Sequence, residues 1–415
     1  MSARSVPAAS VWLSAAVLCV TLGGCKGGST LAAGGAGAAT LNTTALTVDG
    51  GPAAAPGAIN HAYVTVTVCA PGSKTQCASI DHVLLDTDSV GLRLVGSVLA
   101  AKSVSLPAET DGQGNRIEEC VAFGSGQTWG PVARADVSMA GEIAASVPVQ
   151  VMDDTGTGAA APATCGANGT LITGVGGFNA NGLLGVGVFA QDCGSGCTNA
   201  AAPPPVYYGC TTAGACTAES VPLAGQVTNP VAAFATDNNG VIVALPNLPN
   251  ANGEASVTGQ LIFGIGTQSD NALPAASLTI LGTDANGNFT ATYNGGTTVL
   301  PASIDSGTDA YYFDDPSIAL CSSGAFVGYY CPAVAPQNAF AVNTGVGANN
   351  GTGTVDFAIA DPNTFVAGAA AFANLATGRG ATRFTWGMPF FYGRLVYVGI
   401  EQKTVGNTAG PLYAY

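Results

Sequence analysis

The order of apolar and polar residues predicts strands along much of the chain. Residues 61–68 alternate between polar and apolar side chains, which is typical of a strand with one buried face. The apolar residues Val83, Leu84 and Leu85, with Ile80 nearby, then lead into Asp86, and a second apolar run leads to Leu94. We therefore predict a buried strand, a sharp turn that carries a carboxylate, and another strand. Burying Asp86 is costly unless its carboxyl group is hydrogen-bonded or shares a proton.

The same pattern returns in the second half of the chain. Val299 begins an apolar strand that ends in Asp305. The residues that follow each strand read Asp-Thr-Asp-Ser at 86–89 and Asp-Ser-Gly-Thr at 305–308. One such motif is common in ordinary turns, because Asp, Ser and Gly all favour them. The second copy makes Asp305 a candidate partner for Asp86.

Three further segments accompany the two motifs: two lie between them and the third follows the second motif. Residues 121–130 predict a hairpin with an aromatic tip. The residues of its tip are Phe123, Gly124 and Gly126. Residues 181–187 read Asn-Gly-Leu-Leu-Gly-Val-Gly, and no Lys-Ser or Lys-Thr follows, which argues against a phosphate-binding loop. Residues 384–399 form an apolar, aromatic-rich stretch that predicts the last long strand.

These segments resemble the pepsin-like aspartic peptidases. In that family each of two lobes contributes one Asp-Thr/Ser-Gly-Thr/Ser loop, and the two aspartates share a proton. The resemblance implies an all-β, bilobal fold with a central cleft. The implied amino-terminal lobe spans residues 58–268, with a Cys- and Pro-rich surface insertion near 191–228, and the carboxy-terminal lobe spans 269–415. The chain is also similar to uncharacterised bacterial lipoproteins known only as a domain of unknown function.

The resemblance implies a role for each residue of the two motifs. Asp86 and Asp305 are the implied catalytic pair, in which one carboxylate takes a proton from water and the other carboxyl group gives one to the substrate. The implied supporting hydroxyl groups belong to Thr87 and Ser306, which would lock the loops together, and to Ser89 and Thr308, which would hydrogen-bond the outer carboxylate oxygens. The hairpin with Phe123 at its tip is similar to the flap that closes over substrate, where the family usually has a tyrosine.

Two segments depart from the family pattern. Asp88 stands where the family has a glycine, so we expect a backbone strain of about 1–3 kcal/mol and a higher proton affinity of the aspartate pair. Residues 181–187 and Trp386-Gly387 resemble the apolar segment that passes beneath each catalytic loop. In the second of these, Thr385 and Trp386 replace two aliphatic residues.

The amino-acid composition and net charge exclude several classes of protein and of functional site. Of 415 residues, 47 % are hydrophobic, 9 % are charged and 58 are Gly, which fits Gly-rich β structure and excludes a coiled coil. The net charge of −14 argues against nucleic acid as a partner. With only His61 and His82 as histidines, a Ser-His-Asp hydrolase or a multi-His metal site is not expected. We expect no cofactor and no metal, and a monomer.

The amino terminus has the features of a lipoprotein signal. Arg4 precedes an apolar stretch that ends in Leu-Gly-Gly before Cys25. We predict a signal peptide over residues 1–24, a lipid on Cys25 and a flexible Gly- and Ala-rich tether over 25–57. Lys26 favours the outer membrane of the cell envelope as the destination. The alternative is an ordinary signal peptide with a chance cysteine.

Ten cysteines remain when Cys19 and Cys25 are set aside, and an even number in an exported chain favours disulfides. Four pairs are close in sequence, and two cysteines are left for each other, although spacing does not fix connectivity. The expected pairs are Cys69 with Cys77, Cys193 with Cys197, Cys210 with Cys216, Cys321 with Cys331, and Cys120 with Cys165.

Two functions follow as expectations. The first is a membrane-anchored aspartic endopeptidase that acts on peptides or proteins. The alternative is a non-catalytic surface lipoprotein that keeps the two-lobed scaffold for binding or for envelope structure.

Overall fold

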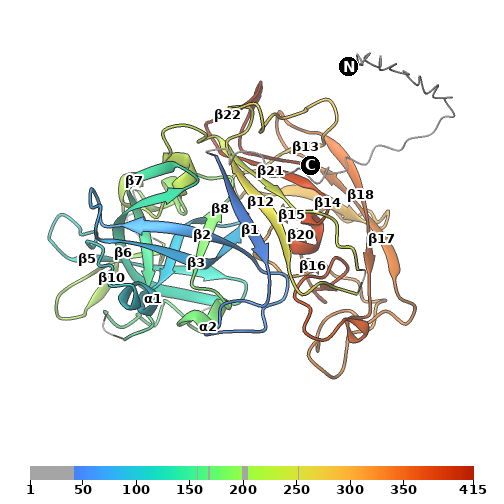
Figure 1. Ribbon diagram of the computed structural model, residues 1–415, viewed down its shortest axis with the longest axis horizontal. Coiled ribbons are helices and arrows are strands. Elements are labelled where there is room, and N and C mark those ends of the chain that lie inside the picture. The colour runs from blue at the N-terminus through green and yellow to red at the C-terminus, as the bar shows by residue number, and fades with distance from the viewer. Residues whose placement is uncertain (1–41, 157, 167–168, 199–203, 251) are drawn as a thin grey trace, which may run out of the picture. The chain divides into compact units, whose positions relative to one another are not determined.

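The computed structural model describes residues 42–415 except 157, 167–168, 199–203 and 251 (Figure 1). The predicted signal peptide, the lipid site at Cys25 and residues 25–41 of the predicted tether lie outside the described residues. None of the helices in the described part is long and apolar enough to cross a membrane.

The described residues are mostly β-strands in two larger sheets, so the expectation of an all-β protein is confirmed. The first sheet has the order β10 (Cys216–Ala218), β9 (Tyr207–Cys210), β5 (Arg116–Phe123), β6 (Gly126–Met139), β7 (Glu142–Met152), β4 (Val90–Val95), β8 (Gly182–Val186), β3 (Cys77–Asp86), β2 (Ala62–Cys69), β1 (Thr43–Val48), β12 (Val257–Phe263), β11 (Gly240–Ala244), β21 (Leu395–Gly399), β24 (Leu412–Ala414) and β13 (Ile280–Gly282).

The second sheet has the order β18 (Thr352–Ile359), β17 (Gln337–Thr344), β14 (Phe289–Tyr293), β15 (Leu300–Ile304), β20 (Phe384–Trp386), β16 (Tyr311–Tyr312) and β19 (Ala376–Thr377). A small hairpin joins β22 (Thr404–Val405) to β23 (Thr408–Ala409). The helices are short: α1 (Gly96–Ala101), α2 (Val175–Phe178), and the 3-10 turns η1 (Gly194–Cys197), η2 (Leu223–Gly225), η3 (Pro230–Ala233), η4 (Pro362–Thr364) and η5 (Met388–Phe391).

Part of the predicted tether is a strand. Residues 43–48 form β1, which lies between β2 and β12 (Figure 1). Leu46 and Val48 are fully buried in the core. The tether prediction is therefore wrong over 43–48. The sequence gives little warning of this strand, because only two large apolar side chains anchor it and its partner β12 lies about two hundred residues away.

The Cys- and Pro-rich region near 191–228 is only partly a surface insertion. Its strand β9 pairs with β5 and is buried along its whole length. The side chains of Tyr207 and Tyr208 supply this burial. The expectation of a surface region is therefore wrong for 207–210, where two aromatic residues extend the large sheet.

The expected division at residue 268 stays a prediction. The second sheet is built only from residues 289–386, but β21, β24 and β13 join the first sheet through the pairing of β11 with β21. One large core of buried side chains takes members from both halves of the chain.

All five predicted disulfides are confirmed. They are Cys69–Cys77, Cys120–Cys165, Cys193–Cys197, Cys210–Cys216 and Cys321–Cys331. Four of them close short local loops, and Cys69–Cys77 joins paired positions of β2 and β3.

Candidate functional site

Asp86 stands at the end of β3, where a third strand supports its loop. β8 lies between β3 and β4, parallel to β3 and antiparallel to β4. Gly185 pairs with Asp86 on one side and with Gly91 on the other. A Cβ atom at Gly185 would lie 2.5 Å from the backbone nitrogen of Val90, so only glycine fits beneath the loop. The segment 181–187 therefore occupies the position that the sequence indicates.

Asp305 has the same local arrangement. It follows β15, and β20 lies between β15 and β16, parallel to the first and antiparallel to the second. Trp386 pairs with Ile304 and is fully buried, so an indole ring replaces the expected aliphatic pair without breaking the strand. A Cβ atom at Gly387 would lie 2.0 Å from the carbonyl oxygen of Ala310. The second loop thus rests on the close approach of a glycine, as the first does.

Reciprocal hydrogen bonds join the two loops. Thr87 Oγ1 donates to the carbonyl oxygen of Ile304 at 2.7 Å, and Ser306 Oγ donates to that of Leu85 at 2.7 Å. The backbone nitrogen of Ser306 donates to Thr87 Oγ1 at 3.0 Å. Both hydroxyl groups are buried. The hydroxyl groups of Thr87 and Ser306 thus form the hydrogen bonds expected of them, and their support of a catalytic pair stays a prediction.

The carboxyl groups of Asp86 and Asp305 both lie close to Gly307. A Cβ atom at Gly307 would lie 3.1 Å from Asp86 Oδ2 and 3.2 Å from Asp305 Oδ1. The separation of these two oxygens therefore cannot exceed the sum of the two distances, so the two carboxyl groups are close neighbours. The missing side chain at Gly307 leaves room for this approach.

Each carboxyl group accepts hydrogen bonds from its own loop. Asp86 Oδ1 accepts from the backbone nitrogens of Asp88 at 2.9 Å and Ser89 at 3.0 Å. Asp305 Oδ1 accepts from the backbone nitrogen of Gly307 at 2.8 Å. Asp305 Oδ2 accepts from Thr308 Oγ1 at 2.5 Å, as expected.

The expectation for Ser89 is wrong. Its hydroxyl oxygen is buried and has no hydrogen-bond partner within the described residues, although its backbone nitrogen bonds Asp86. The side chain of the residue three positions after the aspartate is therefore used in the second loop and not in the first.

The surroundings of Asp305 oppose its ionisation. Burial raises its pKa well above the ordinary value, and the charges of Asp86 and Asp88 raise it further. The hydrogen bonds from Thr308 and Gly307 act in the opposite direction and are outweighed. Asp305 as a whole residue is half-buried.

The backbone strain expected at Asp88 is absent. Asp88 has a negative φ, so it needs no left-handed conformation. Its side chain turns to groups that the sequence analysis did not select: Oδ2 accepts a hydrogen bond from Ser303 Oγ at 2.8 Å and forms an ion pair with Arg383 Nη2 at 3.2 Å. Burial raises the pKa of Asp88 to about 6; Arg383 lowers it and Asp86 raises it.

One signal in the sequence points to Ser303. It lies two residues before Asp305, and residues two apart on a strand share one face. Arg383 carries no comparable signal, because it comes from a segment nearly three hundred residues after Asp88.

The predicted hairpin is present, and its tip packs beside the short helix α2. Phe123 pairs with Gly126 across a two-residue turn. The ring of Phe123 packs edge-on against Phe178 at 5.4 Å and lies 5.6 Å from the guanidinium carbon of Arg93. A Cβ atom at Gly126 would lie 2.4 Å from the carbonyl oxygen of Thr170, so a residue with a side chain does not fit at this position. The flap role of this hairpin stays a prediction.

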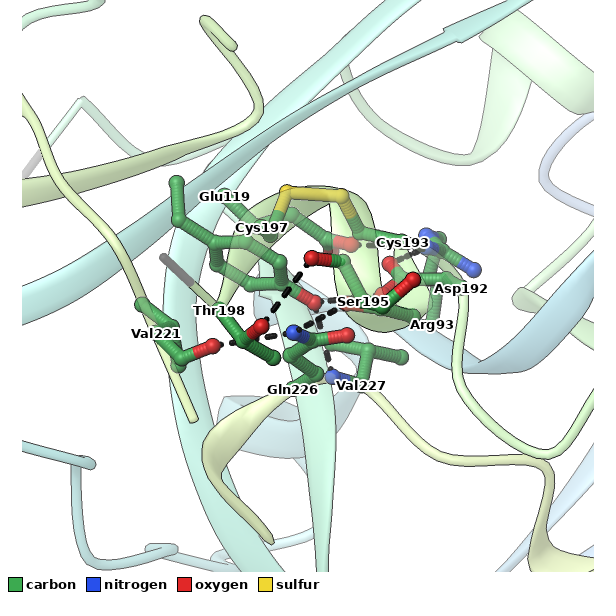
Figure 2. The surroundings of a disulfide bond; sticks show 12 residues. Arg93, Glu119, Asp192, Cys193, Ser195, Cys197, Thr198, Val221, Gln226 and Val227 are labelled. Carbon is green, nitrogen blue, oxygen red and sulfur yellow. Dashed lines mark hydrogen bonds and ion pairs between the residues drawn. A yellow bond between two sulfur atoms is a disulfide. The ribbon is translucent and has the colours of Figure 1, made fainter. Parts of the chain in front are cut away.

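A second group of ionisable side chains is buried beside the Cys193–Cys197 disulfide (Figure 2). Arg93 Nη2 donates to Glu119 Oε1 at 2.7 Å and to Asp192 Oδ2 at 2.8 Å. Arg93 Nη1 donates to the carbonyl oxygen of Val90 at 2.6 Å. Burial raises the pKa of Glu119 well above its ordinary value, and Asp192 adds to this against the influence of Arg93. The group joins β4, β5 and the segment at 192.

Two other features lie apart from the aspartate pair. A hollow of about 240 Å³ is lined by residues such as Trp129, Asp153 and Leu171, and neither Asp86 nor Asp305 contributes to it. Cys321, Cys331 and Asp361 lie at metal-ligand spacing, but the two sulfur atoms form a disulfide with each other, so they are not metal ligands.

Comparison with known proteins places the chain in a family without assigning it a function. A family model described as "Protein of unknown function (DUF3443)" matches residues 38–415. No curated protein matches the chain significantly. Because the match covers nearly the whole sequence, the chain belongs to this family of proteins of unknown function.

Proposed function

We propose that the chain has a two-lobed, pepsin-like fold and is an aspartic endopeptidase. The observation that carries the proposal is the duplicated loop: the carboxyl groups of two aspartates lie together beside Gly307, and hydrogen bonds from Thr87 and Ser306 join the two loops. Each loop also rests on a central strand that runs parallel to the strand before it. Two loops that are supported and joined in this way hold their carboxyl groups close together and leave them little freedom to move.

The proposed chemistry follows from a pair of carboxyl groups of which one is protonated and the other is ionised. Two acids this close cannot both ionise, so the pair holds one proton over a range of pH. Asp305, whose pKa is raised by burial and by neighbouring charges, is the acid that protonates the carbonyl oxygen of a bound peptide. Asp86 is the base that takes a proton from water as the water attacks the carbonyl carbon.

The environment of the enzyme is also part of the proposal. A lipid on Cys25 would hold the protein at the cell envelope, with the outer membrane as its destination. Its substrates would then be peptides or proteins of that compartment. The five disulfides are in keeping with export.

A second function has specific support. Asp88, with its ion pair to Arg383, adds a third carboxyl group where a peptidase of this kind has only a small residue. The alternative is therefore a non-catalytic lipoprotein that uses the same scaffold for binding or for envelope structure.

A digest of a peptide library by the purified chain distinguishes the two functions. The measurement runs from pH 3 to pH 7, with and without pepstatin, and includes Asp88→Gly. The peptidase proposal predicts cleavage that pepstatin and Asp305→Asn abolish, whereas Asp356→Asn, at an exposed position of β18, leaves it intact. If the wild type and Asp88→Gly are both inert at every pH while correctly folded, the non-catalytic function is supported instead.

A further inference from the structure

Asp88, Ser303 and Arg383 form a closed triangle of contacts beside the aspartate pair. Ser303 Oγ donates to Asp88 Oδ2, and Arg383 Nη2 contacts both partners, at 3.2 Å from Asp88 Oδ2 and 2.7 Å from Ser303 Oγ. The triangle connects the loop after β3 with β15, the strand that leads to Asp305. Ser303 is fully buried, whereas Asp88 and Arg383 are partly open to solvent.

The charges of this triangle act on the catalytic pair. The charge of Asp88 is one of the influences that raise the pKa of Asp305. In turn, Asp86 raises the pKa of Asp88, against the lowering by Arg383. The charged and titratable groups around Asp88 come from four elements: Asp86 from β3, Asp305 from the loop after β15, Arg383 from the segment before β20, and Tyr413 from β24.

A count of charge shows what the arginine does. Three carboxyl groups this close would retain more than one proton if no cation were present, because like charges oppose ionisation. Arg383 supplies one positive charge, which balances an ionised Asp88. The remaining two carboxyl groups then carry one negative charge and one proton, as an isolated pair of aspartates would.

We propose that Arg383 is a positioning residue of this centre: it favours the ionised form of Asp88 and holds that side chain aside, so that Asp86 and Asp305 can share a single proton. The consequence for catalysis rests on the proposed peptidase function, but the coupling of charges does not. The negative charge that Asp88 adds in place of a glycine is then balanced by Arg383, which comes from the other half of the chain.

Two single variants and their combination test the pairing by charge. Arg383→Gln leaves Asp88 without its cation, so the carboxyl groups hold protons to a higher pH. Asp88→Asn leaves Arg383 unbalanced beside the pair, so the pair ionises at a lower pH. We expect shifts of opposite sign, each on the order of 1 pH unit, and a return close to the wild-type midpoint when both substitutions are combined. Arg383→Lys keeps the charge and should stay near the wild type.

The readout is the carboxyl ¹³C NMR titration of the full chain labelled at aspartate. The signal of Asp305 is assigned by its loss in Asp305→Asn, and the upper limb of any pH–rate profile is followed in parallel. The control is Arg379→Gln, which makes the same change of net charge at an exposed position. It should leave the Asp305 midpoint unchanged.

The outcomes separate this proposal from the peptidase function. Opposite shifts that cancel in the double variant support the charge pairing, even if no peptide is cleaved. Shifts in the same direction, or no shift, overturn it even if cleavage is observed. If Arg383→Gln fails to fold, Arg383→Lys and Asp88→Asn decide together: a wild-type midpoint of Asp305 in the first and a midpoint at lower pH in the second support the charge pairing, and any other result overturns it.

Discussion

Single residues explain why this centre is only partly readable from a short motif. Thr87 and Ser306 could be assigned because each hydroxyl group directly follows its aspartate, and the chain direction fixes where it points. Ser89 and Thr308 occupy equal positions but differ in use, because packing decides the direction of a side chain three residues away. The partner of Asp88 could not be predicted, since Arg383 comes from the far end of the chain.

Removing the hydroxyl group of Thr87 should weaken the junction of the two loops. Thr87→Val keeps the shape but leaves the backbone groups of Ile304 and Ser306 without this partner. We expect a loss of about 1–3 kcal/mol in the free energy of unfolding, measured with chemical denaturant. Thr87→Ser, which retains the hydroxyl group, should lose less. Equal stabilities of the two variants would argue against the cross-link.

At the scale of elements, the strands before each aspartate were predictable because their apolar runs are long. The supporting strands β8 and β20 were found from glycines after apolar residues, and the close approaches of Gly185 and Gly387 explain why that signal exists. β1 and β9 were missed because each is stabilised by partners distant in sequence. Arg93 ties β4, which follows the first loop, to the hairpin strand β5.

The buried Glu119 should make stability depend on pH. The pKa of Glu119 is raised in the folded protein, so the folded state favours the protonated carboxyl group. Its contribution to the free energy of unfolding is therefore fully present below the pKa of the unfolded chain, near 4.5, and is lost as the pH rises through the pKa of the folded state. Glu119→Gln mimics the protonated form and should therefore gain stability relative to the wild type as the pH rises above about 4.5. Denaturant unfolding at several pH values measures this. Glu254→Gln, in a half-buried position, is the control. Parallel curves for wild type and Glu119→Gln would contradict the prediction.

At the scale of the whole molecule, the all-β architecture and the five disulfides followed from alternation, glycine content and cysteine spacing. The core that the two halves of the chain share could not be predicted from the sequence, because the pairing of β11 with β21 joins segments more than 150 residues apart. The residues predicted to anchor the chain lie outside the described structure, and their role rests on the sequence alone.

The predicted anchor can be tested on the native protein. Wild-type chain expressed in a Gram-negative host should partition with membranes, because a lipid on Cys25 would retain it there. Cys25→Ser should release the protein or block its processing. The measurement is membrane fractionation together with mass spectrometry of the amino terminus. A soluble wild-type protein with an unmodified amino terminus would refute the anchor.

The central claim is that Asp86 and Asp305 act together on one bond of a peptide. The rate of hydrolysis of one susceptible peptide, compared between wild type, Asp86→Asn, Asp305→Asn and Asp356→Asn, tests this most directly. We predict that either substitution in the pair lowers the rate by at least a hundredfold, the lower range for loss of an acid or base, with the fold unchanged. Asp356→Asn should match the wild type. Hydrolysis that survives in Asp86→Asn or Asp305→Asn at the wild-type rate would contradict the account.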